Sequence, residues 1–157
     1  YYMVVQNGMF SDAKDEKLAR EQTTKNIQQA LADLDAAIEA GIKDPRAYYA
    51  RYMVRVWAGP SPGGDQSLES VRESMKADLN TAIELDPLNA GYRFAMGNML
   101  AGILHLGFDD EDSGVTMTEG RKREVVPEAA ALLGLAVELA PENELYRDSY
   151  DKYVGQK

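Results

Sequence analysis

The stretch that decides the fold reads MKADLNTAIELDP and covers residues 75–87. A slim residue opens it, Leu79 follows four positions later and Ala82 seven positions later, which is the spacing of one helix face. Pro87 closes it, because proline has no amide N–H and disfavours a helical residue before it. The stretch therefore predicts a helix that ends just before Pro87.

The same pattern occurs twice more, as ALADLDAAIE at residues 30–39 and as AAALLGLAVELAP at residues 129–141. A proline follows each copy, at Pro45 and Pro141. A small side chain lets two helix backbones approach closely. We therefore expect Ala37, Ala82 and Ala136 to lie at the closest helix–helix approach of their repeats.

A second kind of helix is predicted after the first two prolines, at residues 47–59 and 90–107. Both segments are aromatic near the start, small in the middle and end at glycine, which terminates helices well. Residues 1–5 look like the end of another such helix, and we expect them to pack against the helix that ends near Ala40. Residues 142–154 predict a final helix over the end of the stack.

These segments resemble the tetratricopeptide repeat (TPR) family. The resemblance rests on AIELDP at 82–87, MGN at 96–98, AYYAR at 47–51 and the repeated Ala/Leu/Ala spacing, and it covers most of the chain. It implies an all-α fold, a TPR-like superhelix of antiparallel helix pairs, that is, an alpha-alpha solenoid.

The resemblance divides the chain as a single TPR-like domain, residues 1–157. Its parts are a partial first repeat (1–44), a second repeat (45–86), a third repeat (87–140) and a C-terminal capping helix (141–157). The three prolines are 42 and 54 residues apart, whereas the family unit has about 34 residues. The extra residues fall between the two helices of a repeat, at 59–64 and 108–126. They are either cheap surface insertions or a functional edge.

In the TPR family the first helices of the repeats, the A helices, line a groove that usually takes a peptide or a partner segment. Carried over to this chain, the groove positions are Tyr49, Met53, Val56, Phe94, Asn98 and Ala101. Aromatic and Met side chains give adaptable apolar contact, and the Asn98 amide can both donate and accept. The neighbouring Tyr48, Tyr52, Tyr92 and Met96 are expected to be core. For Arg51, Arg55 and Arg93, solvation or pairing with carboxylates is favoured over ligand binding.

Composition limits the partner. The 157 residues fit one domain, and the net charge of −9 repels phosphate backbones and anionic lipid. A protein or peptide partner with basic groups is easier to accommodate than nucleic acid, and no apolar run is long enough for direct membrane insertion. The absence of cysteine excludes disulfides and thiolate zinc sites, and fits an exported or periplasmic protein slightly better than a cytoplasmic one. A chain starting at Tyr1 is expected to be processed, trimmed or a fragment.

Residues that could perform chemistry are few. His105 is the only histidine, and it lies between two leucines, where a packing role is expected. The glycine-rich residues 59–64 lack the Lys and Ser/Thr that phosphate binding needs. The acidic run from Asp109 begins like a calcium loop, but its twelfth position is Gly120 rather than Glu. We therefore expect no catalytic residues, no metal site and no cofactor.

The sequence favours an interaction module, a scaffold, adaptor or assembly factor or part of a larger complex, that binds a peptide or protein segment in the A-helix groove. The alternative is a structural fragment of a larger repeat protein without a ligand of its own. An enzyme or a calcium-binding protein is a remote alternative.

Overall fold

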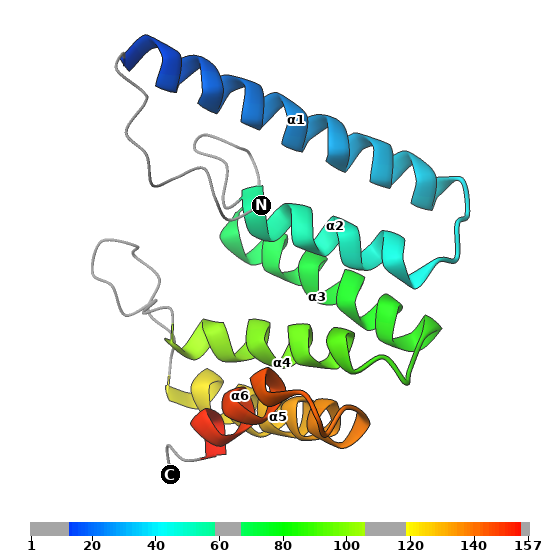
Figure 1. The fold of residues 1–157 in the computed structure, drawn as a ribbon, viewed down its shortest axis with the longest axis vertical. Coiled ribbons are helices and arrows are strands. Elements are labelled where there is room, and N and C mark those ends of the chain that lie inside the picture. The colour runs from blue at the N-terminus through cyan, green and yellow to red at the C-terminus, as the bar shows by residue number, and fades with distance from the viewer. Residues whose placement is uncertain (1–12, 59–66, 106–118, 155–157) are drawn as a thin grey trace.

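The computed structural model describes residues 13–58, 67–105 and 119–154, which form six α-helices and no β-strand (Figure 1). The helices are α1 (Ala13–Glu39), α2 (Pro45–Ala58), α3 (Leu68–Leu85), α4 (Ala90–His105), α5 (Glu119–Leu139) and α6 (Glu144–Val154). The all-α prediction is confirmed. Each helix packs against the next one in the chain, and α4 also touches α6. The predicted helix at residues 1–5 lies outside the described residues.

Local chemistry sets the helix boundaries. Ser67 caps the start of α3, where its hydroxyl oxygen accepts a hydrogen bond from the amide of Ser70 at 3.2 Å. Gly41 ends α1 with φ of +87°, the left-handed conformation that glycine adopts without strain, and its amide donates to the carbonyl of Ile38 at 2.9 Å. Pro45 stands at the first position of α2, where the missing N–H costs nothing.

One predicted insertion is partly helical. Residues 119–126 belong to α5, although they were assigned to the segment between the two helices of the third repeat. Their sequence is EGRKREVV, in which Glu, Arg and Lys are strong helix formers and valine is an acceptable one. The helix continues through Pro127. Residues 59–64 and 108–118 lie outside the described part.

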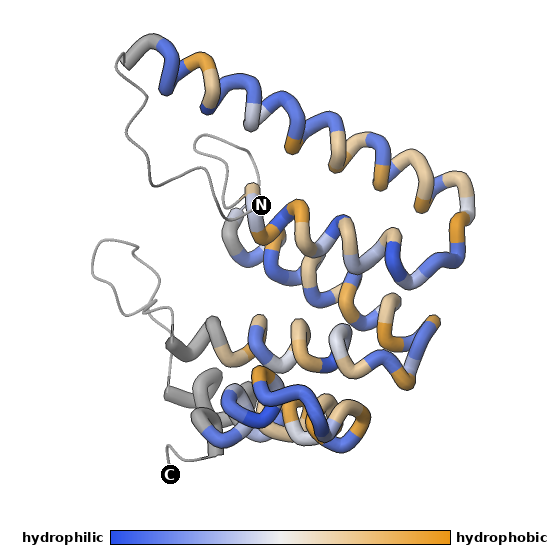
Figure 2. The backbone as a smooth tube through the Cα atoms, viewed as in Figure 1, coloured by the Kyte–Doolittle hydropathy of each residue, from blue (hydrophilic) through white to orange (hydrophobic). Residues whose placement is uncertain are grey.

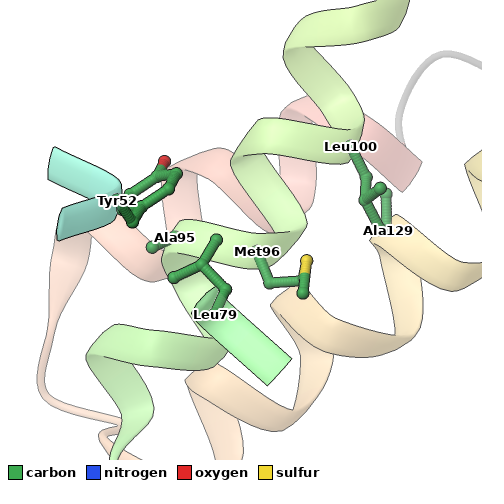
Figure 3. Close-up of a cluster of buried hydrophobic side chains, with 6 residues drawn as sticks. All are labelled: Tyr52, Leu79, Ala95, Met96, Leu100 and Ala129. Atoms are coloured by element: carbon green, nitrogen blue, oxygen red, sulfur yellow. The ribbon is translucent and has the colours of Figure 1, made fainter. Parts of the chain in front are cut away.

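The core lies where α2, α3, α4 and α5 meet (Figure 3). Its buried side chains are Tyr52, Leu79, Ala95, Met96, Leu100 and Ala129. The predicted core residues Tyr52, Tyr92 and Met96 are buried, whereas Tyr48 is half-buried. Ala82 and Ala136 are 0% exposed, as expected for close approaches between helices, and Ala37 is half-buried.

The first helix is different from the others. It has 27 residues against 14 in its neighbour α2, and residues 15–26 are all exposed. In Figure 2, most of the residues along this part of α1 are coloured as hydrophilic. The N-terminal half of α1 therefore adds little to the core.

Candidate functional site

Tyrosine rings in tilted contact join α2 to α4. The ring centroids of Tyr49 and Tyr92 are 5.1 Å apart, and those of Tyr49 and Tyr52 are 5.9 Å apart. Burial raises the pKa of Tyr49, and the nearby Tyr146 of α6 raises it further. Burial also raises the pKa of Tyr92 above its usual value, with smaller contributions from the carboxylates of Asp86 and Asp44. Helices α2 and α4 therefore contact each other through aromatic rings.

The last helix extends this contact. The ring of Tyr146 in α6 lies 4.4 Å from that of Phe94 in α4. Gly91 lies beside this ring, since a Cβ there would be in ordinary van der Waals contact with the Tyr146 hydroxyl oxygen, at 3.5 Å. We call Tyr49, Tyr92, Phe94 and Tyr146 the aromatic row, because together they connect α2, α4 and α6. Tyr146 was predicted to lie in a capping helix, but its contact with Phe94 was not foreseen.

The six predicted groove residues differ in exposure. Tyr49, Met53, Phe94 and Asn98 are half-buried, and Val56 is 46% exposed. Tyr49 and Met53 also pack against the core. Ala101 is 3% exposed, so its side chain belongs to the buried part of α4 and offers almost no surface.

Trp57 is the exposed aromatic residue that the sequence reasoning missed. It is the only tryptophan of the chain, and its residue is 74% exposed. It follows Met53 by four positions, so both lie on the same side of α2. The available signal was a lone tryptophan one turn beyond a predicted groove residue. We call Tyr49, Met53, Val56, Trp57, Phe94 and Asn98 the α2/α4 face.

An ion-paired cluster fixes α2 between α1 and α3. The Arg51 guanidinium donates to both carboxylate oxygens of Asp78 in α3, at 2.5 to 3.1 Å, and to Asp35 in α1 at 2.7 Å. Arg55 also donates to Asp78, which is 2% exposed. The hydrogen bonds from Arg51 to Asp78 raise the pKa of the guanidinium, against the effect of burial. The expectation that these arginines pair with carboxylates is confirmed.

The remaining arginines of α2 and α4 are also engaged. Arg46 pairs with Asp44 at 2.7 Å and lowers the pKa of that carboxyl group through its hydrogen bonds. Arg93 donates to the carbonyl of Pro87 at 2.5 Å. Neither α2 nor α4 contains Asp or Glu. The acidic residues of the chain therefore lie on other segments, and the α2/α4 face is mainly apolar and aromatic.

Among the described side chains, no group of three or more His, Cys, Asp or Glu residues is placed to hold a metal ion. In the same part of the chain, no helix is both long enough and apolar enough to cross a bilayer. The calcium-like segment that starts at Asp109 lies, up to residue 118, outside the described residues.

No family model matches the chain, and no curated protein matches it.

Proposed function

We propose that the chain is a TPR-like helical stack that binds a peptide or protein segment on the α2/α4 face. Three observations support the repeat assignment. The Ala/Leu/Ala stretch occurs three times, in α1, α3 and α5. An Asp-Pro pair stands at the start of the helices between them: α2 begins at Pro45 of the pair Asp44-Pro45, and α4 begins at Ala90, shortly after the pair Asp86-Pro87. The A helices also touch across repeats, α2 with α4 through Tyr49 and Tyr92, and α4 with α6.

The observation that carries the binding proposal is the apolar character of the α2/α4 face. Val56 and Trp57 are exposed on the same side of α2 as half-buried Met53 and Tyr49. Tyr49 contacts Tyr92 of α4, and Phe94 of α4 contacts Tyr146 of α6. Tryptophan and tyrosine are enriched among the residues that contribute most to protein interfaces. An exposed tryptophan bordered by partly covered aromatic rings is therefore a suitable anchor for a partner.

The partner chemistry follows from the charges. Arg46, Arg51, Arg55 and Arg93 have partners within the chain, and α2 and α4 supply no carboxylate. A segment bound on this face is therefore held by apolar and aromatic side chains. Basic groups on the partner, which the net charge of −9 favours, would meet carboxylates on the helices that flank the face.

The test is capture of partners from an extract by the immobilised chain, followed by mass spectrometry, with wild type compared with Trp57→Ala. Leu88→Ala is the matched control, because Leu88 is 77% exposed and lies in the turn between α3 and α4. Loss of a partner with Trp57→Ala alone supports the proposal. Equal losses in both variants indicate nonspecific apolar capture, and a partner that survives both changes moves the site to another surface.

Binding can also be followed directly. The only tryptophan of the chain lies on the proposed site, so its fluorescence reports on this face without labelling. Titration with a captured partner should shift the emission to shorter wavelength as the ring leaves water. An unchanged spectrum at saturating partner would contradict binding at Trp57. Such a result would favour the alternative of a structural unit within a larger repeat protein.

A further inference from the structure

Helix α1 is attached to the rest of the fold on one side. Among the described helices its main packing neighbour is α2, whereas each of the other five helices packs against at least two. From residue 15 to residue 39 of α1, no residue is buried. None of them belongs to the core cluster or to the half-buried hydrophobic residues packed against it. The attachment of α1 is therefore the weakest among these helices, because local stability follows buried apolar contact.

Equivalent residues of the repeated stretch show how large the difference is. Leu34 and Ala37 of α1 correspond to Leu79 and Ala82 of α3 in the sequence. The two residues of α3 are 0% exposed, whereas the two residues of α1 are half-buried. Separating α1 from its neighbour would therefore expose less new apolar surface, and so require less free energy, than separating α3 from the core.

A charged hydrogen bond crosses the contact between α1 and α2. The Nη1 atom of Arg51 donates to Asp35 of α1 at 2.7 Å, and the Asp35 side chain is 47% exposed. Water can take over this contact, since an ion pair with an exposed partner contributes little. Arg51 does not depend on Asp35 for its position, because Nε and Nη2 of the same guanidinium donate to Asp78 of α3. The bond to Asp35 can therefore open while Arg51 stays in place.

The turn after α1 and the helix itself both permit such an opening. Gly41 ends α1 in the left-handed conformation, and a Cβ built there would meet nothing within 4 Å, so the turn has free space around it. Residues 15–26 are helical although they are exposed. Pairs four positions apart, such as Glu16 with Arg20, support this part of the helix without help from α2. Helix α1 can therefore move as one unit about the turn at Gly41.

We propose that α1 is a hinged cover, which undocks from α2 as a unit while α2 to α6 stay folded. The hinge is the turn at Gly41, and the contact that opens is the one between Arg51 and Asp35. Undocking uncovers the side of α2 that carries Arg51, which keeps its hydrogen bonds to Asp78. This side is distinct from the α2/α4 face, because Arg51 follows Tyr49 by two positions and so lies roughly 200° further round the helix. The inference therefore does not depend on the proposed binding function.

Hydrogen exchange of the backbone amides in the full chain measures undocking. A single helix is only marginally stable in water, so the amides of α1 exchange whenever α1 leaves α2. After correction for intrinsic rates, we expect the amides of residues 27–39 to exchange at least about 100-fold faster than those of residues 75–85 and 129–139. Equal protection of the three segments would overturn the proposal, because α1 would then open only when the whole fold unfolds.

Two matched variants test the contact with Arg51. Asp35→Ala removes the carboxylate that Arg51 binds, whereas Asp33→Ala removes an exposed carboxylate of the same helix and changes the helix propensity equally. Residues 27–39 should exchange about threefold to tenfold faster in Asp35→Ala than in Asp33→Ala, with the exchange of residues 75–85 unchanged in both. Equal exchange of α1 in the two variants would overturn the proposal. Faster exchange of residues 75–85 in Asp35→Ala would overturn it too, since α1 would then be part of the cooperative core.

Discussion

Arg51 and Asp78 form a buried, bidentate ion pair between α2 and α3, at a place where the next repeat uses apolar side chains. When α2 and α4 are aligned with Tyr49 opposite Phe94, Arg51 corresponds to Met96. When α3 and α5 are aligned with Met75 opposite Ala129, Asp78 corresponds to Leu132. Met96 belongs to the core, and Leu132 packs against it. In the sequence alignment, the two positions that carry this ion pair in α2 and α3 carry methionine and leucine in α4 and α5.

This correspondence predicts what happens to stability when the ion pair of Arg51 and Asp78 is replaced by methionine and leucine. Asp78→Leu alone should lower the free energy of unfolding by about 3–5 kcal/mol, because it leaves two arginines partly buried without their carboxylate. Adding Arg51→Met should recover part of that loss, because an apolar pair of matching volume is often as stable as a buried ion pair. The recovery is incomplete because Arg55, whose side chain is 21% exposed, still lacks Asp78, whereas Asp35, with a side chain 47% exposed, can be solvated.

Urea denaturation of the two single variants and the double variant measures these values. Arg51→Ala with Asp78→Leu serves as the control, because it removes the charge without filling the space. A double Met/Leu variant as unstable as the sum of the two single changes would show that the two repeats are not equivalent at this position.

Burial of Tyr52 predicts an alkaline limit to stability. Burial, with a smaller contribution from Tyr49, raises the pKa of Tyr52 from 10.0 to about 12. The folded state therefore favours the neutral phenol of Tyr52. Its contribution to the free energy of unfolding is fully present below pH 10.0, where the tyrosine of the unfolded chain titrates. This contribution is lost as the pH rises toward about 12. The loss should approach roughly 2–3 kcal/mol.

The measurement compares the free energy of unfolding of wild type and Tyr52→Phe between pH 8 and pH 12. Phenylalanine cannot ionise, so the variant should lose less stability over this range than the wild type. Phe94→Leu is the control for altered aromatic packing elsewhere. Parallel pH profiles for wild type and Tyr52→Phe would show that another group determines the alkaline transition.

The sequence predicted the helix pairs well because spacing and proline position are local signals. The alignment of Ala82 and Ala136 identified two fully buried contact positions. The partners of Asp78 could not be predicted, because they depend on how α1, α2 and α3 are placed in space. The burial of Ala101 and the ring contact between Phe94 and Tyr146 could not be predicted from the sequence either. Both depend on the tilt of α4 against α5 and α6.

Gly97 predicts a steric limit at the contact between α4 and α5. A Cβ there would lie 2.8 Å from Cγ of Leu133, 2.9 Å from its Cδ2 and 3.3 Å from the carbonyl oxygen of Ala129. Gly97→Ala should therefore cost about 1–3 kcal/mol through overpacking, although alanine is the better helix former by about 1 kcal/mol.

Gly134→Ala is the matched control in α5. Its Cβ would meet only the edge of the Tyr150 ring, at 3.3 Å and 3.9 Å, and the ring can shift. This variant should be neutral or more stable by up to about 1 kcal/mol. Thermal melts of both variants decide the matter, and a rise in melting temperature for Gly97→Ala would mean that α4 does not sit this closely on Leu133.

The contact between Phe94 and Tyr146 predicts that α6 completes the α2/α4 face rather than merely ending the stack. A double-mutant cycle with Phe94→Ala and Tyr146→Ala should give a coupling free energy of about 0.5–1.5 kcal/mol, the usual contribution of an aromatic pair beyond its buried area. Phe94→Ala with Tyr150→Ala is the control, because Tyr150 lies beside Gly134 of α5 instead. That pair should be additive within about 0.5 kcal/mol.

Chemical denaturation supplies all the values, and the comparison also bears on binding. If Phe94 couples to Tyr146, α6 is joined to α4 at this contact, and a bound segment can extend from the α2/α4 face onto α6. If the two substitutions are additive, α6 packs independently, and the face for a partner ends at α4.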